Sequence, residues 1–156
     1  MKLAIIAVGH RMPAWVSAGY EDYARRMPPD MPLSLIEIKP GHRAAGEDGA
    51  RARQMEAGKI LAALPVGSWP VALDECGVQT TTRELAEWMK RWMDEGVSPV
   101  FILGGADGLD DSVKTRAHKL LGLSKLTLPH ALARVVLAEQ LYRAVSVLKG
   151  HPYHRD

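Results

Sequence analysis

The last seven residues, Gly150 to Asp156, place several chemically active side chains at one end of the chain. They follow a strongly helical segment and include Tyr153, His154 and Arg155. Chain ends are usually frayed and polar. A phenol, an imidazole and a guanidinium in consecutive positions, after a turn set by glycine and proline, therefore favour a functional tail.

A glycine-rich turn follows the apolar run that ends at Leu103. The turn extends from Gly104 to Gly108, and Asp110, Asp111 and Ser112 open the helix expected after it. Glycines let the backbone approach a ligand closely, and ligands of open α/β sheets bind beyond the carboxyl ends of the strands. The spacing is not Gly-x-Gly-x-x-Gly, and the acidic residues would repel a phosphate, so a dinucleotide or triphosphate is disfavoured. A tight turn that binds no ligand is the alternative.

The segment from Leu123 to His130 is apolar but has no helical period. Backbone N–H and C=O groups in such a setting suit a neutral heterocycle such as adenine, held by main-chain hydrogen bonds and stacking. The alternative is a short edge strand over Lys125–Leu128, which the residue pattern alone favours.

Cysteine and histidine give little support to other chemistry. Cys76 is the only cysteine, and its neighbours Asp74 and Glu75 disfavour the thiolate that covalent catalysis requires. His151 and His154 supply two metal ligands at most, with no cysteine partner. We expect no metal site.

Elements with the pattern of buried strands must position these residues. The strand candidates are Lys2–Val8, Leu33–Ile38, Trp69–Leu73, Val100–Leu103 and Lys125–Leu128. Helical patterns alternate with them, and one opens with a capping box, Thr81-x-x-Glu84, and ends at Gly96. This alternation predicts one α/β domain over residues 1–156, with a mostly parallel sheet and helices on both faces.

The last helix, from about Ala131 to Lys149, carries apolar residues around most of its circumference. A surface helix needs only one apolar stripe. We infer that one face packs on the domain core and another on a second subunit. A central helix within a monomer is the alternative.

Composition limits the class of protein. Of the 156 residues 47% are hydrophobic, as in a globular domain, and the apolar runs are too short to span a bilayer. The single cysteine suits a reducing cytoplasm, where we expect the protein. The net charge of +2 is modest for a protein that binds naked nucleic acid by charge alone. Either the substrate is not nucleic acid, or other surfaces help to present it.

The run Leu123 to Ala144 resembles the C-terminal motif of the SPOUT, or α/β-knot, methyltransferases. The start of the chain, Leu73-Asp74, the turn Leu103 to Gly108 and the tail His151 to Arg155 are similar to one member family, the ribosomal RNA large-subunit methyltransferase H family. The similarity covers essentially the whole chain.

This resemblance implies a parallel sheet whose C-terminal part forms a deep trefoil knot, a rare feature that composition does not suggest. It also implies a homodimer and S-adenosylmethionine as cofactor. The implied cofactor contacts are Leu73, Gly104, Leu123, Ser124, Lys125, Leu126, Thr127 and Leu128.

The implied reaction is methylation of N3 of a pseudouridine in large-subunit ribosomal RNA, within the ribosome. We expect Tyr153 or His154 to accept the N3 proton and Arg155 to stabilise negative charge on the carbonyl oxygens. The sequence leaves open which of the first two does so. The alternatives are a non-catalytic ribosome assembly factor and a SPOUT enzyme that acts on transfer RNA.

Overall fold

A computed structural model describes residues 1–43, 46 and 48–154. Five parallel strands form one sheet in the order β2-β1-β4-β3-β5. They are β1 (Leu3–Val8), β2 (Leu33–Ile38), β3 (Ser68–Gln79), β4 (Ser98–Leu103) and β5 (Lys119–Gly122). The helices are α1 (Ala14–Arg26), α2 (Ala50–Ala63), α3 (Thr82–Asp94), α4 (Asp111–Arg116) and α5 (His130–Lys149). The expected α/β fold with a parallel sheet is confirmed.

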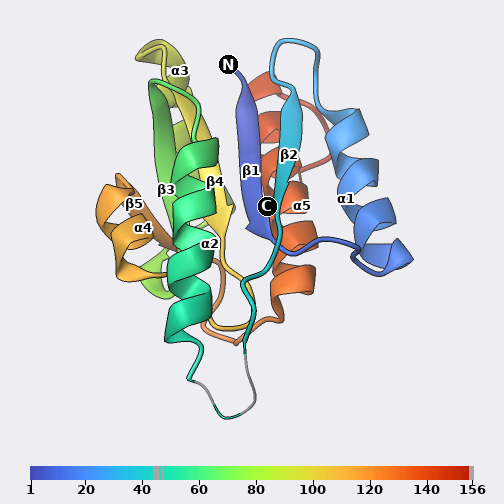
Figure 1. Ribbon diagram of the computed structural model, residues 1–156. Coiled ribbons are helices and arrows are strands. Elements are labelled where there is room, and N and C mark those ends of the chain that lie inside the picture. The colour runs from blue at the N-terminus through green and yellow to red at the C-terminus, as the bar shows by residue number, and fades with distance from the viewer. Residues whose placement is uncertain (44–45, 47, 155–156) are drawn as a thin grey trace.

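Each face of the sheet has its own apolar core, because successive strand residues point to opposite faces. On β4, Phe101 and Leu103 pack with residues of α1, α3 and α5. Val100 and Ile102 pack with residues of α2 and α4. Figure 1 shows α2 in front of the sheet and α5 behind it. Helices therefore cover both faces, as the continuous apolar strands indicated.

Helix α3 begins and ends where the sequence predicted. The Thr81 hydroxyl accepts a hydrogen bond from the Glu84 backbone at 3.1 Å, and the Glu84 carboxylate accepts one from the Thr81 backbone at 2.7 Å. The chain leaves the helix at Gly96, whose φ of +70° is left-handed. The capping box and the terminal glycine are both confirmed.

Two of the strand predictions need correction. The segment Lys125–Leu128 is not a strand, and the fifth strand is instead Lys119–Gly122. Strand β3 also continues beyond Leu73 to Gln79, because β5 pairs with it on both sides of a register break: Leu121 is the partner of both Leu73 and Val78. This long-range pairing has no counterpart in the local residue pattern.

Helix α5 packs against the sheet and is flanked by α1 and α3. Neighbours within the same chain thus cover much of the apolar circumference noted in the sequence. Leu132 and Val136 remain partly exposed. Within the described residues, no helix is long and apolar enough to cross a membrane.

Candidate functional site

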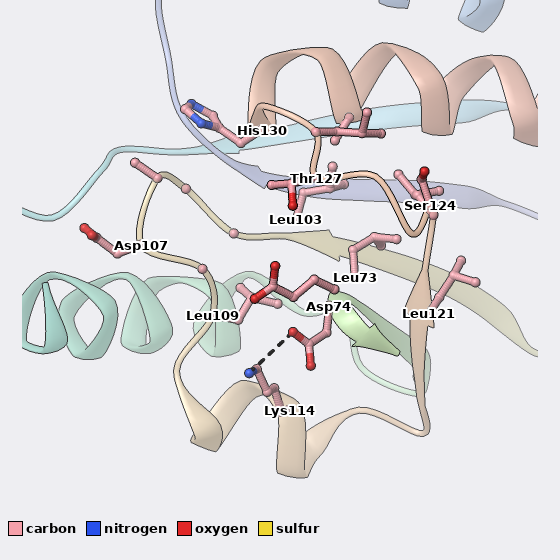
Figure 2. Close-up of a pocket in the computed structure, with 18 of the residues that line it drawn as sticks. Leu73, Asp74, Leu103, Asp107, Leu109, Lys114, Leu121, Ser124, Thr127 and His130 are labelled. Atoms are coloured by element: carbon pink, nitrogen blue, oxygen red, sulfur yellow. Dashed lines mark ion pairs between the residues drawn. The ribbon is translucent and has the colours of Figure 1, made fainter. Parts of the chain in front are cut away.

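A cavity of about 570 Å³ lies beyond the carboxyl ends of β4 and β5 and beside the middle of β3. Three segments form most of its wall: Leu73–Glu75 in the middle of β3, Leu103–Leu109 at the end of β4 and after it, and residues of the segment 123–130. Figure 2 shows side chains from these segments around one space. The volume falls within the range of small-molecule sites, roughly 300–1,000 Å³.

The cavity brings together the cofactor contacts expected from the sequence, with one exception. Leu73, Gly104, Leu123, Ser124, Leu126, Thr127 and Leu128 all line it. Lys125 is exposed and is not among the lining residues. The segment 123–128 therefore borders a cavity instead of extending the sheet.

The glycine turn after β4 is closed on itself. The Gly108 N–H donates to the Gly105 carbonyl at 3.1 Å, and Gly108 has a φ of +78°. A Cβ on Gly104 would lie 2.6 Å from the carbonyl carbon of Gly108. The sequence assigned this glycine to close approach of a ligand. The structure shows that the turn itself already requires it.

Carboxylates outnumber cations around the cavity. The acidic lining residues are Asp74, Glu75, Asp107 and Asp111, and the cationic ones are Arg53 and Lys114. The Lys114 ammonium lies 3.6 Å from the Asp74 carboxylate, as the dashed line in Figure 2 marks, and Asp107 is paired with Arg43 at 2.7 Å. This balance suits a ligand with net positive charge and disfavours a phosphate.

A further acidic residue, Asp110, directly precedes helix α4 beside this cavity. The Asp110 carboxylate accepts hydrogen bonds from the Ser112 hydroxyl at 2.6 Å and from the Ser112 backbone at 3.1 Å. These hydrogen bonds hold the pKa of Asp110 below its usual value. A negative charge thus occupies the helix start at neutral pH, where a phosphate would otherwise bind.

Several lining residues were not singled out from the sequence. Arg53 comes from α2 and Lys114 from α4, and no local spacing relates them. His130 was included only as the end of the apolar segment, and it lines the cavity from the first position of α5. Cys76 is exposed and does not line the cavity.

The described part of the tail, up to His154, does not line the cavity of its own chain. The Tyr153 hydroxyl donates to Glu139 at 3.1 Å, and its ring packs 4.6 Å from the ring of Tyr142. Glu139 is six residues beyond the lining residue Ala133, which is about 9 Å along the helix. Neither Tyr153 nor His154 lines the cavity.

Tyr153 and His154 differ in their surroundings. Burial, with help from the Glu139 carboxylate, raises the pKa of Tyr153 to about 12. The Nδ1 atom of His154 is buried without a hydrogen-bond partner in the described part of the chain. Arg155 lies outside the described residues.

The full chain also matches known proteins. A family model described as a predicted SPOUT methyltransferase matches residues 1–154. A ribosomal RNA large subunit methyltransferase H of Thiobacillus denitrificans is 69% identical over 156 residues, which is 100% of both chains. The chain belongs to this SPOUT methyltransferase family.

A second relative and a solved structure are also similar to this chain. The ribosomal RNA large subunit methyltransferase H of Ralstonia pickettii is 52% identical over 155 residues, 99% of each chain. The crystal structure of a probable methyltransferase from Bordetella pertussis shares the fold with a TM-score of 0.58. It is 16% identical and the match covers 92% of this chain and 95% of that one. Membership of the ribosomal RNA large subunit methyltransferase H family (the H family) thus indicates the class of activity, and the structure indicates where the site lies.

Proposed function

We propose that the chain methylates N3 of a pseudouridine in the RNA of the large ribosomal subunit, within the ribosome of the cytoplasm. As a member of the H family it is an S-adenosylmethionine-dependent ribosomal RNA methyltransferase. The structural observation that supports the proposal is the cavity beside the middle of β3 and beyond the carboxyl ends of β4 and β5. The exact base and atom follow from the resemblance of the sequence.

The cavity fits S-adenosylmethionine in three respects. Its volume of about 570 Å³ suits a ligand of this size. Leu73, Leu123 and Leu126 offer apolar surface beside irregular backbone, which suits an adenine ring. The excess of carboxylates suits a molecule with a sulfonium and an ammonium against one carboxylate. When bound, the cofactor supplies a methyl group for an in-line displacement, so the main task of the protein is alignment.

The chain's own residues must hold the base and take up its proton. We assign the proton to His154, because the raised pKa of Tyr153 keeps that phenol protonated at neutral pH. The buried Nδ1 atom of His154, in the same tail, has no hydrogen-bond partner within the described residues and so does not already hold a bond that a proton would displace. We assign to Arg155 the stabilisation of the negative charge that develops on the carbonyl oxygens of the base.

We further propose that the protein is a homodimer in which each tail serves the cavity of the partner subunit. The contact of Tyr153 with the middle of α5 supports this, because neither Tyr153 nor His154 lines the cavity of its own chain. Partly exposed apolar residues on two neighbouring helices also support it: Trp15 of α1 is 58% exposed, and Leu132 and Val136 of α5 are half-buried.

We also propose that the C-terminal part of the chain forms the trefoil knot of the SPOUT fold. The contact between β3 and β5 supports this proposal. Residues 74–77 leave the ladder between the two pairings of Leu121, and a Cβ on Gly77 would lie 2.6 Å from the Leu121 carbonyl carbon. In a pulling experiment a knotted chain would extend to less than the roughly 3.3–3.6 Å per residue of an open chain. Full extension would contradict the knot.

Mass spectrometry of ribosomal RNA from a strain that lacks the gene tests the activity. We expect one pseudouridine to lose a methyl group and to regain it when the wild-type gene returns. An unchanged RNA would favour the assembly-factor alternative. Loss of a methyl group from transfer RNA instead would favour the transfer RNA alternative, which has no added RNA-binding domain to support it in these 156 residues.

A further inference from the structure

The turn between β1 and α1, Gly9 to Pro13, has a strained backbone that presents two basic side chains. Among the described residues, Arg11 is the one non-glycine residue with a positive φ, at +54°. This left-handed conformation is unfavourable for a side chain with a Cβ, and such strain persists mainly where function requires it. His10 and Arg11 are both exposed, and no described residue pairs with the Arg11 guanidinium.

A buried arginine from the last helix holds this turn. Arg134 is 3% exposed, and its Nη2 donates to the Gly9 carbonyl at 3.3 Å while its Nη1 bonds the Glu37 carboxylate at 2.9 Å. The Gly9 N–H donates to the Ile38 carbonyl at 2.8 Å. The ends of β1 and β2 and helix α5 are thus tied together at Gly9.

Burying a guanidinium is costly, and Arg134 does not recover the full cost. Its Nε is buried without a hydrogen-bond partner within the described residues, and its one ion pair is to Glu37, whose side chain is 41% exposed. A purely structural role would be filled at lower cost by an apolar side chain. The arrangement therefore indicates that the position of the turn itself is required.

The turn follows a strand whose end lies beside the wall of the proposed cofactor cavity. Ala7 of β1 pairs with Leu103 of β4, and the next residue, Val8, lies so close to Gly105 that a Cβ there would be 3.0 Å from it. Arg134 directly follows the lining residue Ala133. A nucleotide that reaches the cavity over this edge would carry its flanking phosphates past the turn.

We propose that the turn Gly9–Pro13 binds the phosphate backbone of the substrate RNA, with Arg11 as the contact and Arg134 as a positioning residue. The inference rests on the proposed function, because it requires an RNA substrate. An arginine fork matches a phosphate in two points.

Steady-state kinetics on ribosomes from the deletion strain, at saturating S-adenosylmethionine, test the contact. We expect Arg11→Gln to raise KM for the ribosome on the order of fivefold, with kcat and cofactor affinity unchanged. The slope of log KM against log salt should become shallower by about 0.7–0.9, the value for one lost phosphate contact. Arg11→Lys should restore part of the affinity and most of the slope, since it keeps the charge. The matched control is Arg25→Gln, an exposed arginine near the end of α1.

Arg11→Gly separates function from folding, because glycine relieves the strain while it removes the charge. We expect the same rise in KM as for Arg11→Gln, with a thermal midpoint that does not fall. A midpoint that falls together with affinity would mean that Arg11 acts through the fold, and would overturn the contact.

A double-mutant cycle tests the positioning role. Arg134→Lys should raise KM for the ribosome in the wild-type background and add little in Arg11→Gln, because Arg134 acts through Arg11. If Arg134→Lys does not fold, Glu37→Gln weakens the same clamp and should show the same coupling at smaller size. Equal, additive effects in both backgrounds would overturn the role of Arg134. A wild-type KM and salt slope in Arg11→Gln and in Arg11→Gly would overturn the inference and leave the methyltransferase function intact. A wild-type enzyme that leaves the ribosomes unmethylated would instead contradict the proposed function.

Discussion

Leu126 is an apolar side chain that lines the cavity and is nevertheless 77% exposed. Its packing contributes little to the fold, so its apolar surface is free to be covered by a ligand. We expect Leu126→Ser to weaken S-adenosylmethionine binding about tenfold, because it removes roughly 1.4 kcal/mol of apolar burial. Calorimetric titration measures this, and the thermal midpoint without cofactor should stay constant.

Val66 provides the control for this prediction. It is fully exposed in the connection between α2 and β3 and does not line the cavity. Val66→Ser should leave cofactor affinity unchanged. Equal affinity in Leu126→Ser and Val66→Ser would place the adenine elsewhere.

The two described tail residues should have different effects on catalysis. His154→Ala should lower kcat by roughly 10²–10⁴-fold, because a general base typically contributes this much to the rate. Tyr153→Phe should leave the shape of the pH–rate profile unchanged up to about pH 10, since a tyrosine with a pKa of about 12 stays protonated throughout. A kcat in His154→Ala close to that of the wild-type protein would rule out His154 as the base.

At the scale of elements, the close packing of β3 against β5 depends on one glycine. We expect Gly77→Ala to destabilise the protein by about 1–3 kcal/mol, because its Cβ would lie 2.6 Å from the backbone of Leu121. Cofactor affinity should fall as well, since Leu73 and Glu75, on the same strand, line the cavity. Denaturant unfolding and calorimetry measure the two effects.

A second glycine gives the opposite sign and serves as the control. Gly58 lies within α2, and a Cβ there would meet no atom within 4 Å. Gly58→Ala should stabilise the protein by about 0.5–1 kcal/mol, because alanine restricts the unfolded chain and favours the helix. Destabilisation by both changes would indicate that close packing at Gly77 is not the cause.

At the scale of the whole molecule, the homodimer and the shared site can be tested together. Tail-deleted subunits and Gly104→Val subunits should each be inactive alone, and a refolded mixture should regain activity at one composite site per mixed dimer. Leu132→Glu should abolish this rescue and yield monomers in sedimentation equilibrium. Met55→Glu, on α2 of the opposite face, should not. A mixture that stays inactive while dimers form would show that the tail acts on its own chain.

The sequence by itself determined the parts that depend on near neighbours. β1, β2, α5 and the capped helix α3 follow from periodicity and capping, which act over a few residues. The ordered motifs from Leu73 to His154 were sufficient to predict the family, and most of the expected cofactor contacts line one cavity.

Only the tertiary structure decided the rest, because it depends on contacts between distant segments. Lys119–Gly122 became a strand instead of Lys125–Leu128, since β5 pairs with both parts of β3. The buried position of Arg134 arises from groups at Gly9 and Glu37, 125 and 97 residues away. The position of Tyr153 follows from a hydrogen bond to Glu139 and a ring contact with Tyr142. No local pattern encodes such pairings, because their energies exist only after the chain has closed the loops between them.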